Sequence, residues 1–171
     1  MKIGIIYATK GGTTRECANL LSKYFCNHDV ALLEIGKDEI DLDAFEFVVV
    51  GFPIRMARAQ KNARRFLKVN KDKLSSKRAA YFICCGFTDC FEEYAEKSIP
   101  TELYESAIDI ACFGGSLDHT RFKGFDRMLV KTIRNEILGG GDNADQRHDM
   151  ALPTIFEANI SQFADSVKQK I

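Results

Sequence analysis

Short, unbroken apolar runs constrain the fold of this chain more than any other feature of its sequence. Three clear runs cover Ile3–Tyr7, Phe47–Gly51 and Ala79–Cys85. Each run is apolar throughout rather than alternating, which is typical of strands buried on both faces of a parallel sheet. Val30–Ile35 and Ile108–Gly114 show weaker forms of the same pattern. The sequence therefore predicts a sheet of five parallel strands.

Segments with helical periodicity lie between these runs. Thr14–Phe25 places apolar residues at i, i+3, i+4 and i+7, and Ala59–Leu67 separates an apolar stripe from arginines. A capping box of the Thr-x-x-Glu type, Thr154–Glu157, predicts the start of the last helix. Strands that alternate with helices imply right-handed crossovers and a doubly wound α/β fold with helices on both faces. We expect residues 1–171 to form a single domain.

The composition predicts a soluble, cytoplasmic protein. No apolar stretch approaches the roughly 20 residues that span a membrane. The apolar run after Lys2 is far shorter than the core of a signal peptide. The six cysteines show neither a C-x-x-C pair nor zinc-ligand spacing, so most are expected to be small core residues. Whether Cys84, Cys85 or Cys90 is redox-active stays open, although adjacent strand residues point to opposite faces.

A Gly/Thr-rich turn joins the first predicted strand to the first predicted helix. Glycines let backbone N–H groups approach a ligand, hydroxyls donate hydrogen bonds, and a helix N-terminus favours an anion. Thr13 and Glu16 also fit a capping box, but that explains only those two residues. We interpret the turn as a phosphate-binding loop, composed of Thr9, Lys10, Gly11, Gly12, Thr13 and Thr14.

Three other anion-binding sites do not fit this turn. A P-loop requires a lysine and a hydroxyl residue directly after its last glycine, and the dinucleotide motif G-x-G-x-x-G is absent here. A phosphoacceptor domain of the same topology would need carboxylates where the strands end. The first and third strands instead end in Tyr7-Ala8 and Gly51-Phe52.

The turn resembles the phosphate motif of the flavodoxins, (S/T)-x-T-G-x-T. Thr9, Gly12 and Thr14 match it, whereas Gly11 stands where the family usually has threonine. The resemblance implies a flavodoxin-like fold that binds FMN by its phosphate. It also implies that loops after the third and fourth strands contact the isoalloxazine ring. The residues at these positions are Pro53, Ile54, Arg55, Met56 and Ala57 in the first loop, and Cys85, Gly86, Phe87 and Thr88 in the second.

Flavodoxins often stack aromatic side chains, commonly including tryptophan, on the ring. This chain has no tryptophan. Phe52, Phe87, Phe91 and Tyr94 are the candidates to replace it, and Phe52 fits the core equally well.

A narrower similarity concerns Gly51–Arg55, Gly114–Leu117 and Phe125–Met128, together with Lys131. These segments resemble the menaquinone-dependent protoporphyrinogen oxidase group. The resemblance implies an FMN-dependent oxidoreductase that acts on protoporphyrinogen or a similar anionic planar substrate, with a quinone as electron acceptor. The alternative is a non-catalytic electron carrier for a protein partner. In both cases the flavin performs the chemistry, so no catalytic side chain and no metal are predicted.

The charge of the chain is zero overall but unevenly distributed. Ten Lys or Arg and one acid lie between Arg55 and Arg78, and Arg121–Ile137 is a second basic, amphipathic segment. Such charges would steer an anionic substrate or redox protein, although a solvated helix face is the alternative interpretation. No nucleic-acid motif is present, and at most peripheral membrane contact is expected.

Spacing predicts one helical stripe of Arg55, Arg58, Lys61, Arg65 and Lys68.

Overall fold

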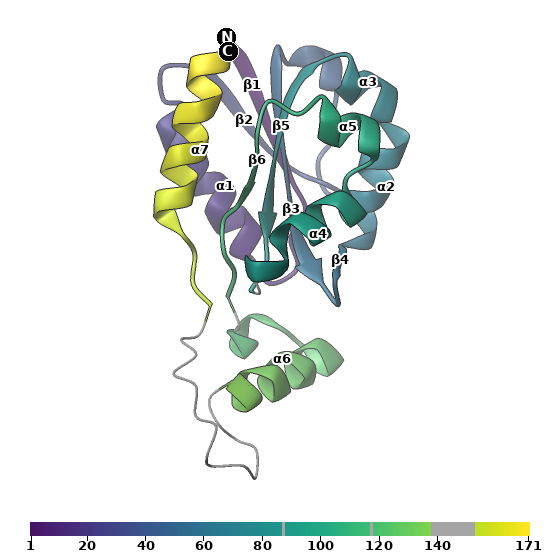
Figure 1. Ribbon diagram of the computed structural model, residues 1–171, viewed down its shortest axis with the longest axis vertical. Coiled ribbons are helices and arrows are strands. Elements are labelled where there is room, and N and C mark those ends of the chain that lie inside the picture. The colour runs from purple at the N-terminus through teal and green to yellow at the C-terminus, as the bar shows by residue number, and fades with distance from the viewer. Residues whose placement is uncertain (87, 117, 138–152) are drawn as a thin grey trace.

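The computed structural model describes residues 1–86, 88–116, 118–137 and 153–171. At its centre is a parallel sheet in the order β2-β1-β3-β5-β6 (Figure 1). A two-residue strand, β4, pairs antiparallel with the end of β3. The predicted α/β fold with a doubly wound parallel sheet is thereby confirmed. The strands are β1 (Lys2–Tyr7), β2 (Asp29–Glu34), β3 (Phe47–Arg55), β4 (Arg58–Ala59), β5 (Arg78–Cys84) and β6 (Ile110–Cys112).

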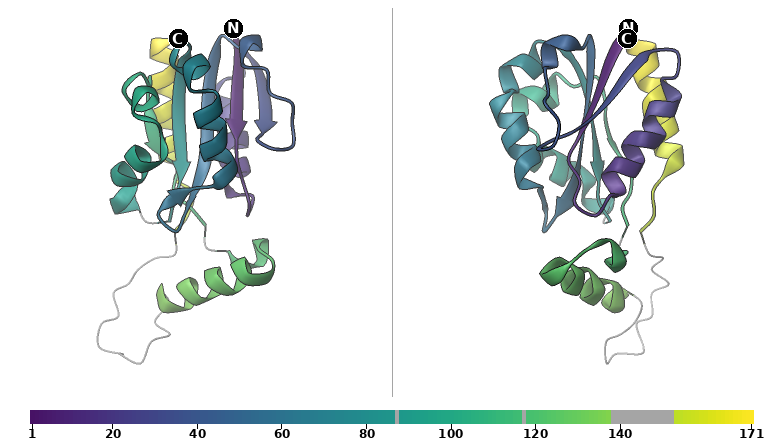
Figure 2. Two further views of the ribbon diagram at one scale, coloured as in Figure 1. Left: turned by 90° about the vertical axis from the view of Figure 1, so that its right-hand side faces the viewer. Right: turned by 180° about the vertical axis from the view of Figure 1, so that it is seen from behind.

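Helices cover both faces of the sheet (Figure 2). One face carries α1 (Thr13–Tyr24) and α7 (Glu157–Lys170). The other face carries α2 (Lys61–Val69), α3 (Lys71–Ser75), α4 (Phe91–Ser98) and α5 (Thr101–Glu105). The helix α6 (Gly124–Ile137) lies beyond the carboxyl ends of the strands, apart from both layers (Figure 1). Among the helices in the described part of the chain, none has the length and apolar character to cross a bilayer.

The central strand β3 shows why the apolar runs are unbroken. Phe47 and Val49 point to the core beneath α1 and α7, whereas Val48, Val50 and Phe52 point to the core on the opposite face. All five side chains are fully buried. A strand with two buried faces has no position for a polar residue, which produces the continuous apolar pattern. Phe52 is therefore a core residue.

The predicted capping box Thr154–Glu157 is wrong, and the alternative capping box of Thr13 and Glu16 is not formed either. The helix α1 begins after Gly12, which has a φ of 87°, and α7 begins after Phe156; neither helix has a side-chain cap. The segment before α7 is held by tertiary pairing, because the Phe156 N–H donates to the Phe113 carbonyl at 3.0 Å. Gly12 adopts the left-handed conformation that favours glycine, so the chain turns into α1 there.

The predicted single basic stripe is also wrong. Arg55 and Arg58 stand opposite each other in the β3–β4 hairpin, whereas Lys61, Arg65 and Lys68 lie on α2. The reason is that β3 continues beyond Gly51 by pairing first with β5 and then with β4. The helix therefore begins only at Lys61, and the expected first loop is largely strand.

Candidate functional site

A cavity of about 290 Å³ opens at the carboxyl ends of β1, β3 and β5, and residues of α6 line its other side. Ligands of open α/β sheets bind at this edge. All three sequence segments that were predicted to form the site contribute lining residues here. The predicted residues that line the cavity are Thr9, Lys10, Gly11, Thr13, Thr14, Pro53, Ile54, Arg55, Met56, Ala57, Cys85 and Gly86.

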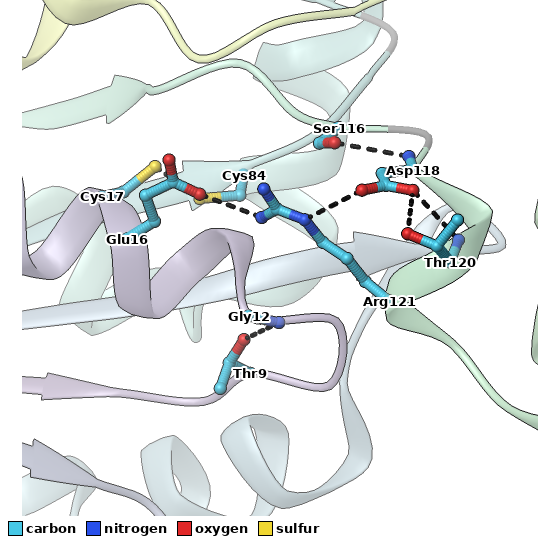
Figure 3. Close-up of polar contacts among 9 residues, drawn as sticks. All are labelled: Thr9, Gly12, Glu16, Cys17, Cys84, Ser116, Asp118, Thr120 and Arg121. Atoms are coloured by element: carbon cyan, nitrogen blue, oxygen red, sulfur yellow. Dashed lines mark hydrogen bonds and ion pairs between the residues drawn. The ribbon is translucent and has the colours of Figure 1, made fainter.

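Two of the predicted residues, Gly12 and Thr88, have other positions. Gly12 shapes the loop from within, since its N–H donates to the Thr9 hydroxyl at 3.0 Å (Figure 3). Thr88 lines a separate cavity of about 630 Å³, which Cys112 and residues of α7 also line. Phe87 lies outside the described residues.

The cavity also has lining residues that sequence reasoning missed. Tyr94 was considered only for stacking, and the segment Gly114–Leu117 only as part of a family resemblance. Helical periodicity indicated an amphipathic segment at Arg121–Ile137, but Phe125 and Met128, which fall on its predicted apolar side, are exposed, and Val130, which does not, is buried. The additional lining residues are Cys84, Tyr94, Gly115, Ser116, Phe122, Leu129, Val130 and Ile133.

Thr14 is the most informative residue of the loop. It lies in the first turn of α1 and is only 1% exposed. Within the described residues its hydroxyl oxygen makes no hydrogen bond that meets distance and angle criteria; the neighbouring Cys84 sulfur is a weak acceptor that would not replace one. A buried hydroxyl without a partner costs roughly 1–3 kcal/mol, so such a group indicates a missing ligand. Because Thr14 also lines the cavity, that ligand would lie there.

Two cations of the cavity share one carboxylate. Lys10 and Arg55 both form ion pairs with Asp126, in the first turn of α6. Hydrogen bonds from Lys10 and Arg55 lower the pKa of Asp126. The Arg55 guanidinium also lies 5.3 Å from the centre of the Phe122 ring. These contacts hold the start of α6 against the phosphate-loop side of the cavity.

A second ion-pair group ties the segment before α6 to α1. Arg121 lies between Glu16 of α1 and Asp118, with nitrogen–oxygen distances of 2.9 Å and 3.3 Å (Figure 3). The Asp118 N–H in turn donates to the Ser116 hydroxyl at 3.3 Å. Glu16, which fitted a capping box in the sequence, therefore holds the segment that precedes α6.

Phe122 explains why glycine stands at position 11. A β-carbon at Gly11 would lie 2.4 Å from the Phe122 ring, far closer than atoms can approach. The ring thus occupies the space of the threonine side chain expected from the flavodoxin motif. The loop loses one hydroxyl and gains an apolar contact with the segment that precedes α6.

The β3–β4 turn forms another edge of the cavity. Met56 and Ala57 have φ angles of 51° and 59°, the left-handed region that side chains rarely adopt. Such residues cost of order 1–3 kcal/mol each and cluster at functional sites. Met56 is also 84% exposed, although methionine is apolar. The turn therefore presents strained backbone and an apolar side chain at the cavity rim.

Comparisons with known proteins agree with this geometry. A family model described as a flavodoxin domain matches residues 4–145, so the chain belongs to the flavodoxin domain family. Among curated proteins, none matches the chain. The predicted flavodoxin-like family is thereby confirmed, whereas the protoporphyrinogen oxidase subgroup stays a prediction.

Two solved structures with TM-scores above 0.5 show the same fold at low sequence identity. Oxidised flavodoxin 2 from Bacillus cereus superposes with a TM-score of 0.53 at 19% identity, over 100% of both chains. A flavo di-iron protein variant from Thermotoga maritima has a TM-score of 0.55 at 13% identity, covering 99% of this chain and 36% of that one. A Fusobacterium nucleatum flavodoxin bound to flavin mononucleotide has a TM-score of 0.46 at 18% identity, covering 68% and 72%.

Proposed function

We propose that this chain is a redox protein that binds FMN in the 290 Å³ cavity. The phosphate would lie in the Thr9–Thr14 loop and the isoalloxazine ring between the segments that follow β3 and β5. The observation that carries the proposal is the buried Thr14 hydroxyl, which lacks a partner and lines the cavity. A phosphate oxygen is the acceptor that this donor requires, and the N-terminus of α1 favours its charge.

The chain's own residues would hold and shield the flavin. Lys10 and Arg55 supply positive charge beside the loop, and Asp126 keeps that charge balanced. Leu129, Val130 and Ile133 of α6 supply an apolar cover that excludes water. When bound, FMN provides reversible electron transfer, and the protein contributes orientation and electrostatics.

Titration of the flavin-free protein with FMN, riboflavin and FAD tests this proposal. We expect FMN to bind most tightly, because riboflavin lacks the phosphate and FAD extends it with an adenylate group. Calorimetry or the quenching of flavin fluorescence gives the three dissociation constants. Equal affinity for riboflavin and FMN would show that the loop does not bind phosphate.

We further infer that the redox partner is anionic. Arg58 and Lys61 are exposed and directly follow the turn at the cavity rim. The substrate implied by the family resemblance is protoporphyrinogen or a similar planar anion, with a quinone as acceptor. The sequence segments that resemble the protoporphyrinogen oxidase group support this substrate by their positions. Arg55 and Ser116 line the cavity, and Asp126 binds Arg55.

The position of α6 favours a second candidate, an electron carrier for a protein partner. A planar substrate would have to reach the ring beneath Leu129, Val130 and Ile133, which requires α6 to move. Electron transfer to a docked protein needs no such movement. Reduction or oxidation of the bound flavin by small quinones and porphyrinogens, compared with redox proteins, distinguishes the two.

Changing Arg58 and Lys61 together to glutamine is expected to slow the reaction of reduced flavin with an anionic acceptor. The effect should decline as salt rises, because exposed charges are screened over about 8 Å at physiological ionic strength. Stopped-flow reoxidation at low and high salt measures it. Lys23→Gln with Arg78→Gln removes the same charge at the opposite end of the sheet and serves as control. If both double variants match the parent at every salt concentration, the basic residues are only a solvated surface.

A further inference from the structure

We propose that Cys85 and Cys112 form a reversible dithiol–disulfide site that reacts with small-molecule disulfides. The two sulfur atoms lie 3.4 Å apart, in van der Waals contact. Cys112 is the last residue of β6, and Cys85 directly follows β5. Both stand where the strands leave the sheet, each followed within two residues by a glycine, Gly86 or Gly114. A sulfur–sulfur bond of about 2.05 Å requires the two sulfur atoms to approach more closely than in this contact.

The pair lies between the 290 Å³ and 630 Å³ cavities described above. Cys85 lines the candidate flavin cavity, and Cys112 lines the 630 Å³ cavity beside Thr88 and Asn159. The two residues are only 3% and 8% exposed, so neither is an ordinary surface thiol. A small disulfide can therefore reach Cys112 from the second cavity, while Cys85 faces the first.

The surroundings assign different roles to the two sulfurs. The hydrogen bond with the Cys85 thiol, together with those from the backbone N–H groups of Gly114 and Cys85, brings the pKa of Cys112 to about 7 despite its burial. The hydrogen bond with Cys112, followed by burial, raises the pKa of Cys85. Since the thiolate is the nucleophile, Cys112 is the attacking residue and Cys85 the resolving one.

The reaction follows thiol–disulfide exchange. The Cys112 thiolate attacks one sulfur of the small disulfide, forms a mixed disulfide and releases one thiolate. Cys85 then attacks the Cys112 sulfur and releases the second thiolate, which takes up the Cys85 proton. The small disulfide is reduced to two thiols, and the two cysteines are oxidised to one disulfide. Excess small thiol reverses both steps.

The other sulfur contact of the core does not share these features. Cys17 and Cys84 lie 3.6 Å apart, and Cys17 is completely buried. The hydrogen bond to Cys17, together with burial, raises the pKa of Cys84 well above its usual value. Neither residue lines the second cavity. We infer that this contact is packing only.

Oxidation with glutathione disulfide tests the site in the full chain. A Cys26→Ser background removes the exposed thiol. We expect the folded protein to lose two thiols and to recover both with dithiothreitol. Non-reducing peptide mass spectrometry should show a link between Cys85 and Cys112. Cys85→Ser should instead accumulate glutathione on Cys112, and Cys112→Ser should abolish the link and slow modification of Cys85 at least tenfold. Circular dichroism verifies that each variant is folded.

A link between Cys17 and Cys84, or no loss of thiols until the protein is unfolded, would overturn the proposal. Mapping in the Cys26→Ser background decides the result even if a serine variant at position 85 or 112 does not fold. The proposal is independent of the proposed function, because the exchange is measured without added flavin. A failure here leaves the FMN titration unaffected, and the reverse also holds.

Discussion

Replacing Thr14 with valine is expected to weaken FMN binding about tenfold or more while stabilising the flavin-free protein. Valine keeps the shape of threonine but removes the hydroxyl. A hydrogen bond to a charged group contributes roughly 1.5–3 kcal/mol, which corresponds to a factor of at least ten in affinity. In the flavin-free protein the same hydroxyl is buried without a partner, so its removal relieves a cost of roughly 1–3 kcal/mol.

The opposite signs of the two effects make this test specific. Titration with FMN measures the first, and urea unfolding of the flavin-free protein measures the second. Riboflavin affinity should change little, because riboflavin lacks the phosphate. Thr101→Val, at an exposed threonine that begins α5, is the matched control and should alter neither quantity. If Thr14→Val binds FMN as tightly as the parent, Thr14 has no role in phosphate binding.

Introducing the family's threonine at position 11 is expected to impair this protein. Gly11→Thr adds a hydroxyl to the loop, but its β-carbon would lie 2.4 Å from the Phe122 ring. Overpacking of this kind costs about 1–3 kcal/mol. Because Phe122 also contacts Arg55 and precedes α6, displacement of the ring should loosen α6 from the cavity. Trypsin cleavage at the basic residues of α6 should accelerate several-fold.

A second substitution distinguishes this steric cause from other effects. Phe122→Ala removes the ring, so the double variant Gly11→Thr with Phe122→Ala should recover stability relative to Gly11→Thr alone. Its FMN affinity should also exceed that of Phe122→Ala, since the added hydroxyl is then unobstructed. A double-mutant cycle of unfolding free energies measures the coupling. Additive costs would mean that Phe122 does not occupy the space that threonine needs.

Local patterns were sufficient to predict the sheet. Strands such as β3 are buried on both faces, so every position is apolar and the run is visible without knowledge of its neighbours. The weaker pattern of β2 has a physical reason as well, because Val30, Ala31, Leu32 and Leu33 of this edge strand are only partly buried. The helices α3, α4 and α5 escaped prediction, since segments of five to eight residues hold too few turns to show a period.

The turn that we propose binds phosphate was also visible in the sequence, because its glycines and hydroxyl residues are consecutive. The same sequence showed that Gly11 departs from the flavodoxin motif but offered no reason for it. The reason is Phe122, a residue more than a hundred positions away whose ring fills the space. The capping boxes failed for a related cause, since Glu16 has a partner in Arg121 and Phe156 pairs with Phe113.

Contacts between remote segments were decided by the tertiary structure alone. The position of α6 over the cavity, the shared Asp126 and the Cys85–Cys112 contact each join residues brought together by crossovers between strands. A pair contact of this kind imposes no period and no spacing on the chain, so a single sequence carries no trace of it. The residues that would bind phosphate can therefore be identified from the sequence, whereas the residues of α6 that cover the site are identified only from the folded structure.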